Sequence, residues 1–178
     1  MKSKHNKTTQ RVIAMAALTI GLFFASAKLM TAQQSGAVRQ TAVAWPNGKT
    51  FYFKGSEYIC YDNATDHTDA GYPRQIASGW PGLWADGIDA VFVWPNGKAY
   101  FFRGSQYIRW DIRSQRVDSG YPTTIASGWP GVWSDHIDAA VSWPNGKTYF
   151  FRGNQFISYD TNSARPDPCG PKLFSCRS

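Results

Sequence analysis

The sequence predicts an all-β protein in which small antiparallel sheets stack around a common axis, which is the architecture of a β-propeller. Three observations support this fold class: an internal repeat of 49 residues, short aromatic-rich runs between turn signals, and no long helical pattern after residue 32. A sheet of a few short strands cannot bury both of its faces alone. Similar sheets that follow one another around an axis cover each other's faces, so the repeat favours a propeller.

The repeat is marked by the pentapeptide Trp-Pro-Asn-Gly-Lys, which begins at Trp45, Trp94 and Trp143. Residues 88–118 and 137–167 are identical at 19 of 31 positions without a gap, which excludes chance similarity and low complexity. The connector between units repeats as well, because the Gly-Tyr-Pro and Trp-Pro-Gly motifs that follow the first unit return after the second. The chain therefore contains three similar units.

The first half of each unit predicts a β-hairpin. In the second unit, residues 88–94 form a short apolar run that leads into Pro-Asn-Gly, where Asn and Gly tolerate the positive φ of a tight turn. Residues 98–103 are rich in aromatic side chains and suit a packed, pleated surface. We expect these two runs to pair as antiparallel strands.

The second half of each unit continues the sheet and then leaves it. Gly104 and Ser105 predict another turn, and residues 106–111 predict a third strand. A weaker polar stretch up to Val117 predicts an edge strand. Residues 123–127 predict a short helix that ends at Gly128, after which the chain enters the next unit.

Residues 1–32 predict a signal peptide. A basic start is followed by an uncharged apolar run over residues 12–27, and small residues predict cleavage after Ala27 or after Ala32. An uncleaved membrane anchor is the alternative, although this run is shorter than the roughly 20 residues that span a bilayer. We expect a secreted protein, extracellular or periplasmic, with no membrane contact after cleavage.

The charge of the mature chain excludes one class of partner. Five of the 19 basic residues and none of the 12 acidic residues lie in residues 1–32, so a chain that starts at Gln33 has a net charge of +2. A nucleic-acid-binding surface needs a dense cluster of Lys and Arg. The remaining charges are interspersed, and we therefore expect no nucleic-acid partner.

The three cysteines, Cys60, Cys169 and Cys176, are candidates for a disulfide in an exported protein. Two of them can pair, which leaves the third free or available to another chain. A bond between Cys169 and Cys176 would close a local loop, whereas a bond from Cys60 would join the first unit to the tail. The sequence leaves all three pairings open.

Several motifs together resemble the repeats of the hemopexin family. They are Ile-Asp-Ala at the start of the second and third units, the strand ending in Phe-Arg-Gly, the strand after it, and the connector from Gly-Tyr-Pro to Trp-Pro-Gly. The resemblance implies a hemopexin-type β-propeller with four blades, of which this chain supplies about three within residues 33–171. Blade 1 would span residues 38–84, blade 2 residues 87–133 and blade 3 residues 136–171, with residues 172–178 as a tail.

The resemblance also implies a metal site. In the family, the innermost strand of each blade begins at the Asp-Ala motif, and main-chain carbonyls there hold calcium, sodium or a similar ion in a central tunnel. By position these are the carbonyls of Asp89, Val91, Asp138, Ala140, Gln40 and Ala42. Oxygen ligands suit hard cations. Whether the two Asp side chains face the ion or brace the inner strand stays open, and the first unit has Arg39-Gln40-Thr41 in place of Ile-Asp-Ala.

Three units do not complete a ring of four blades. The sequence leaves three alternatives open, which are an open protein with three blades, association with another chain, and a fragment of a longer parent. An open propeller exposes two apolar blade faces, and this favours self-association.

The chain has no recognisable catalytic motif, and we expect a non-enzymatic binding module. Its ligand would be a protein or a small molecule, such as haem or a polyamine, at the tunnel mouth or the blade edges. His136, just before the third blade, is the candidate axial ligand for haem. The alternatives are an extracellular propeller lectin that uses the repeated Trp and Tyr residues, and a structural subunit that completes a propeller by oligomerising.

Overall fold

The structure is a computed structural model of the chain, and it describes residues 38–173. The signal peptide and its cleavage sites, together with Cys176, lie outside the described residues. Within them, no helix is long and apolar enough to span a bilayer.

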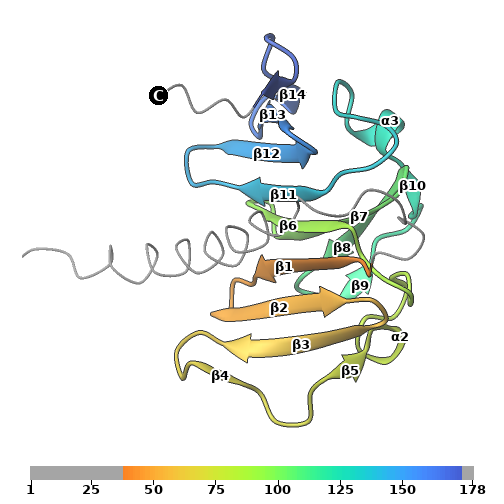
Figure 1. The fold of residues 1–178 in the computed structure, drawn as a ribbon, viewed down its shortest axis with the longest axis vertical. Coiled ribbons are helices and arrows are strands. Elements are labelled where there is room, and N and C mark those ends of the chain that lie inside the picture. The colour runs from red at the N-terminus through yellow and green to blue at the C-terminus, as the bar shows by residue number, and fades with distance from the viewer. Residues whose placement is uncertain (1–37, 174–178) are drawn as a thin grey trace, which may run out of the picture. The chain divides into compact units, whose positions relative to one another are not determined.

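Three antiparallel sheets of five strands each make up the described residues, and the prediction of an all-β fold is confirmed (Figure 1). The first sheet contains β1 (Gln40–Ala44), β2 (Lys49–Lys54), β3 (Glu57–Asp62), β4 (His67–Thr68) and β5 (Arg74–Gln75). The second contains β6 (Ala90–Trp94), β7 (Lys98–Arg103), β8 (Gln106–Asp111), β9 (Arg116–Val117) and β10 (Thr123–Thr124). The third contains β11 (Ala139–Ser142), β12 (Lys147–Arg152), β13 (Gln155–Asp160), β14 (Arg165–Pro166) and β15 (Lys172–Leu173). In each sheet the first three strands form a meander, and the two short strands both pair with the third.

The hairpin turn of each repeat differs in one detail from the expectation. Positive φ occurs at Gly97, at 77°, and not at Asn96. The N–H of Gly97 donates to the carbonyl of Trp94 at 3.2 Å, and Asn96 Oδ1 accepts from the N–H of Lys98 at 3.0 Å. Pro95 therefore sits at the second position of a four-residue turn, and the Asn side chain stabilises the turn without a left-handed backbone.

The connector helix is shorter than expected. Helix α3 (Ile125–Gly128) begins two residues later than the sequence pattern suggests, because Thr123 and Thr124 pair with β8 as the short strand β10. The hydroxyl of Thr124 accepts from the N–H of Ser127 at 3.3 Å and caps the helix. The first connector has the equivalent helix α2 (Ile76–Gly79).

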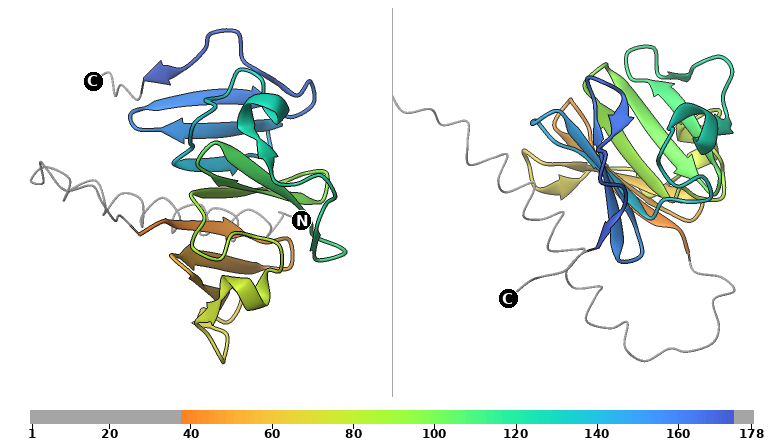
Figure 2. Two further views of the ribbon diagram at one scale, coloured as in Figure 1. Left: turned by 90° about the vertical axis from the view of Figure 1, so that its right-hand side faces the viewer. Right: turned by 90° about the horizontal axis from the view of Figure 1, so that it is seen from above.

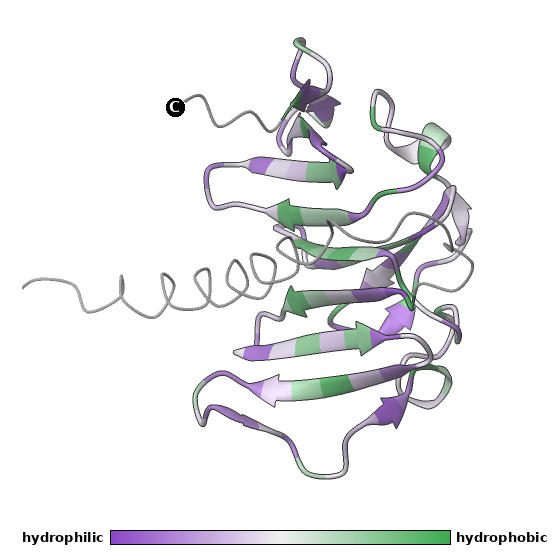
Figure 3. Ribbon diagram, viewed as in Figure 1, coloured by the Kyte–Doolittle hydropathy of each residue, from purple (hydrophilic) through white to green (hydrophobic). Residues whose placement is uncertain are grey.

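The sheets pack against one another in chain order, as the orange, green and blue elements show in Figure 2. One apolar cluster fills the interface between the first and second sheets, and another fills the interface between the second and third. Hydrophobic residues accordingly occupy the middle of the strands, whereas the turns are largely hydrophilic (Figure 3). The second sheet therefore has both faces covered, like the central layer of a sandwich.

A tryptophan from each connector lies at the centre of the interface that follows it. Trp80 is 5% exposed and packs edge-on against Phe51 and Phe53 of the first sheet and obliquely against Trp110 of the second. Trp129 takes the same place at the next interface and is 3% exposed. Edge-to-face aromatic pairs add about 0.5–1.5 kcal/mol each beyond the burial of their surface. Aromatic residues therefore pack between neighbouring blades at both interfaces.

Candidate functional site

The inner strands lie together along the line where the three sheets meet. Strand β6 runs next to both β1 and β11, and each of these three strands pairs with a neighbour on one side only. Main-chain groups on the other edge of each strand are therefore outside the sheet ladders. The predicted metal carbonyls belong to this region: Gln40 and Ala42 on β1, Asp89 and Val91 at β6, and Asp138 and Ala140 at β11.

The Asp side chains of the Asp-Ala motif brace the turn between the second and third strands of their blades. Asp89 Oδ2 accepts from the N–H of Gly104 at 2.7 Å, and its other oxygen accepts from Arg39 Nε of the first blade. Asp138 Oδ2 accepts from the N–H of Gly153 at 2.6 Å. These bonds join the start of the inner strand to that turn, and whether the carboxylates also face an ion stays a prediction.

The donor groups of the chain restrict how it could hold a metal ion. Among the described residues there is no group of three or more His, Cys, Asp or Glu side chains that could hold one. A cation at the inner strands would therefore depend on main-chain oxygens, which are ligands that calcium accepts readily. The described side chains thus offer no site of their own, and the carbonyl site at the inner strands stays a prediction.

The haem candidate His136 is half exposed and lies between two carboxylates. Its Nε2 is 3.2 Å from Asp138 Oδ1, and its Nδ1 is 3.7 Å from Asp135 Oδ2. His136 lines neither of the two surface hollows that lie between the second and third blades.

The two described cysteines are not joined to each other. Cys60 is buried on β3, whereas Cys169 is exposed in the loop before β15 in another blade. Burial raises the pKa of the Cys60 thiol to about 11, and a hydrogen bond with Asp69 adds to the effect. A bond between Cys60 and Cys169 is thus absent, and the pairings that involve Cys176 stay predictions.

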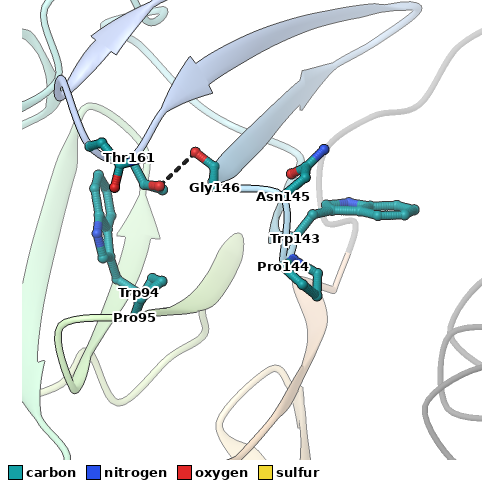
Figure 4. A pocket seen from close by; sticks show the side chains of 8 residues that line it. Trp94, Pro95, Trp143, Pro144, Asn145, Gly146 and Thr161 are labelled. Carbon is teal, nitrogen blue, oxygen red and sulfur yellow. Dashed lines mark hydrogen bonds between the residues drawn. The ribbon is translucent and has the colours of Figure 1, made fainter. Parts of the chain in front are cut away.

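A hollow of about 400 Å³ opens between the turns of the second and third blades (Figure 4). Trp94 and Thr161 stand on one side of it, and the turn from Pro144 to Gly146 forms the other. The hydroxyl of Thr161 donates to the carbonyl of Gly146 at 2.6 Å, which ties the two sides together. The indole of Trp143 points away from Trp94 and is 44% exposed.

A second hollow of about 340 Å³ shares Trp94 and Thr161 with the first. Its other walls are mostly aromatic and come from both blades: Tyr100, Tyr107, Tyr121, Trp129 and Tyr159. The hydroxyl of Tyr159 donates to the carbonyl of Ala164 at 2.6 Å. Because the two hollows adjoin at these shared residues, we refer to them together as the interblade groove.

Charged groups near the interblade groove are neutralised by close partners. Arg109 Nε donates to Asp118 Oδ2 at 2.5 Å, and its guanidinium lies over the ring of Tyr121, 5.1 Å from the centroid. Asp118 also pairs with Lys98. Burial alone would raise the pKa of Asp118, but the hydrogen bonds from Lys98 and Arg109 lower it on balance. The groove therefore has polar walls with little net charge.

The sequence interpretation did not identify the interblade groove. The signal was present, because the repeat changes at this place: Thr161 and Tyr159 occupy the positions that Ile112 and Trp110 hold one repeat earlier. Only the packing of blade against blade shows that these two changes line the same hollow. A comparison of the repeats position by position would have singled them out.

The family model described as Hemopexin matches residues 40–85, 88–134 and 137–175. Interstitial collagenase of Equus caballus is 47% identical over 45 residues, which are 25% of this chain and 9% of that protein. Matrix metalloproteinase-18 of Xenopus laevis is 42% identical over an equally short stretch, also 9% of its length. The chain therefore spans only a small part of these relatives.

Solved structures of plant proteins are similar over most of the described fold. LS24, a seed albumin from Lathyrus sativus, has a TM-score of 0.61 and 26% identity over 66% of this chain and 58% of its own. A plant albumin from Cicer arietinum showing hemagglutination has a TM-score of 0.66 and 23% identity over 75% and 66% of the two chains. A plant lectin with two metal binding sites from the same species has a TM-score of 0.65, also at 23% identity. Three matches to one family model, which together cover more than half of the sequence, show that this chain belongs to the hemopexin repeat family.

Proposed function

We propose that this chain is a secreted, non-enzymatic binding module that carries a metal ion at its inner strands and a ligand at a blade interface. One observation carries the proposal: neither hollow of the interblade groove is lined by His, Cys, Ser, Asp or Glu. General acid–base catalysis most often uses His, Asp or Glu, and a Thr or Tyr hydroxyl that acts as a nucleophile needs an adjacent base to activate it. Aromatic and amide walls suit binding instead.

Two further findings support a binding role. The similar solved structures are albumins and lectins, and their printed descriptions name hemagglutination and metal binding for those proteins. In the described residues, the connectors and turns that line the groove are fixed by hydrogen bonds within the fold. A site that is formed before the ligand arrives loses less entropy on binding.

The metal ion would be held by main-chain carbonyls of the inner strands. The oxygens of Asp89, Val91, Asp138 and Ala140, with those of Gln40 and Ala42, are the proposed ligands. Calcium or sodium is the expected ion, because these cations accept uncharged oxygen ligands. A bound ion would stabilise the folded state by an amount that grows with the logarithm of the free ion concentration once that concentration exceeds the dissociation constant.

The metal proposal is tested on the purified protein by equilibrium dialysis against calcium chloride, followed by metal analysis and a thermal melt. We expect bound calcium and a melting temperature that rises with calcium concentration. The Asp138→Asn and Asp89→Asn variants serve as controls, because both keep the main-chain carbonyl. Binding that is lost in these variants, or no bound calcium or sodium in the wild type, would contradict a carbonyl site.

A further inference from the structure

The interblade groove occurs where one blade interface departs from its own repeat. At the first interface, Ile112 and Trp110 pack into the apolar cluster, and Trp110 is 2% exposed with its ring centroid 5.1 Å from that of Trp80. At the second interface the corresponding residues are Thr161 and Tyr159, which are smaller and carry hydroxyl groups. Tyr159 still packs on Trp129, with ring centroids 5.2 Å apart, but Thr161 replaces an apolar side chain of the cluster with a smaller polar one. Burial of apolar area stabilises an interface, so the change at Thr161 gives up packing.

Two other residues that line the second hollow are also more polar than their counterparts at the first interface. Tyr100 replaces Phe51, and Arg109 replaces Cys60, so that the second interface has hydroxyl and guanidinium groups where the first has apolar ones. Asn96 Nδ2 donates to the hydroxyl of Tyr100 at 3.3 Å. Four substitutions therefore place hydroxyl and guanidinium groups beside the apolar cluster that fills the rest of this interface.

The chemistry of the groove limits the class of its ligand. Trp94 provides an aromatic surface, and Thr161, Asn145 and Asn162 provide hydroxyl and amide groups around it. Asn145 Oδ1 accepts from the N–H of Lys147 at 3.0 Å, and among the described residues its amide nitrogen has no acceptor. Carboxylates and histidines are missing from both linings, and Arg109 is paired with Asp118, so neither a polyamine nor an anion finds an unpaired opposite charge.

An aromatic wall beside neutral hydrogen-bonding groups suits a molecule that has an apolar face and several hydroxyls. Sugar rings have this combination, since their C–H groups form one face and their hydroxyls the edge. The volume of each hollow, about 400 and 340 Å³, lies within the range of about 300–1,000 Å³ that small-molecule sites occupy. We propose that the interblade groove at Trp94 and Thr161 binds a neutral saccharide, an inference that rests on the chain being a binding module.

The test uses a variant that copies the first interface into the second. Thr161→Ile introduces the residue that the fold already accepts at Ile112, removes the hydroxyl and adds bulk to the groove. Thr161→Ser is the matched control, because it keeps the hydroxyl that donates to Gly146. Asn162→Ala is a second variant, on an exposed turn residue whose side chain can be removed without disturbing the core.

Galactose, N-acetylglucosamine, lactose and cellobiose would be titrated into the full protein, with tryptophan fluorescence and calorimetry as readouts and spermine as the charged comparison. We expect at least one of the sugars to bind, Thr161→Ile to weaken it by about tenfold or more, and Asn162→Ala to weaken it severalfold. Thr161→Ser should bind within about threefold of the wild type.

Three results would overturn the inference: no sugar binds the wild type, spermine binds in the groove in place of a sugar, or both Thr161→Ile and Asn162→Ala bind as tightly as the wild type. Calcium binding is measured on the same preparations. If calcium is retained while sugar binding fails, the groove assignment falls and the metal proposal stands. If sugar binding is retained while calcium binding fails, the metal proposal falls and the groove assignment stands.

Discussion

Each repeat places a lysine directly after its hairpin glycine, and this lysine connects three parts of the blade. Lys49 Nζ lies 2.8 Å from Asp62 at the end of β3 and 2.9 Å from Asp69 of the connector. Lys98 and Lys147 make the same two contacts in the other blades. The pentapeptide is therefore conserved within the chain for two reasons, the turn and this ion-pair network.

The network predicts that stability falls in acid. The hydrogen bond from Lys49 lowers the pKa of Asp62 to about 2, whereas the unfolded value is about 3.9. Because the folded pKa is the lower one, the contribution is fully present above about pH 4 and is lost as pH falls towards 2. We expect the melting temperature to decrease over this window, as measured by calorimetry. In Lys49→Met the acid dependence should be smaller, and an unchanged pH profile would contradict the role of the pair.

The buried thiol of Cys60 should react slowly while the protein is folded. Its pKa of about 11 and its burial keep the thiol protonated and inaccessible near pH 8, and the thiolate is the reactive form. We expect a thiol reagent to label Cys60 slowly in the native protein and rapidly after unfolding in urea. Peptide mapping by mass spectrometry separates this residue from the exposed Cys169. Fast labelling of native Cys60 would argue against the buried environment.

The connectors join one blade to the next, and the short helix of each connector packs closely against the third strand of the preceding sheet. A Cβ added at Gly128, at the end of α3, would lie 1.9 Å from the hydroxyl oxygen of Tyr107, and Gly79 has the same relation to Tyr58. Both tyrosines are buried. The Gly that ends each helix is therefore required by close packing against the third strand and not by a positive φ.

Gly128→Ala should consequently destabilise the fold by about 1–3 kcal/mol, because overpacking forces the Tyr107 ring or the helix to move. Urea unfolding measures the loss. The double variant Gly128→Ala/Tyr107→Phe removes the nearest atom and should recover part of the stability. If Gly128→Ala unfolds at the wild-type urea concentration, the close approach seen here is wrong.

At the scale of the whole molecule, the second blade links the other two, because one of its faces belongs to each apolar cluster. Trp80→Ala and Trp129→Ala each remove a nearly buried ring from one cluster, and such truncations cost about 3–5 kcal/mol. We expect either variant to lower the midpoint of one cooperative transition in calorimetry. Two separate transitions in the wild type would show that the blades unfold independently.

The outward faces of the first and third blades predict self-association. Tyr52 is 38% exposed on the first blade, and Val141 and Trp143 are 38% and 44% exposed on the third. By the repeat these positions correspond to residues of the second blade that a neighbouring blade covers: Phe101 and Phe92 are buried, and Trp94 is partly buried. A second copy of the chain is therefore a suitable partner. Sedimentation velocity should show a dimer or larger species that Trp143→Lys and Val141→Lys shift towards monomer. A monomer at all concentrations would contradict this prediction.

Most of the fold follows from the sequence because its signals are local and occur three times. The turn residues around Gly97, the aromatic run of β7 and the Trp-Pro-Gly connector each constrain a few neighbouring residues, and the 49-residue period then orders the sheets. At Thr123 and Thr124 the local sequence predicted helix, but the structure has a short strand there because both residues pair with β8. The interblade groove could not be derived in this way, because Trp94 and Thr161 are 67 positions apart and belong to different blades.

The sequence by itself determined the fold class, the three units, the family and the absence of a recognisable catalytic motif. The tertiary structure decided that Asp89 and Asp138 brace turns, that Cys60 and Cys169 are not joined, and that two hollows with hydroxyl and amide groups lie beside the apolar cluster of the second blade interface. The physical reason is that hydrogen bonds and turn preferences act over a few residues, whereas a cavity depends on side chains from separate sheets that meet only when the blades pack.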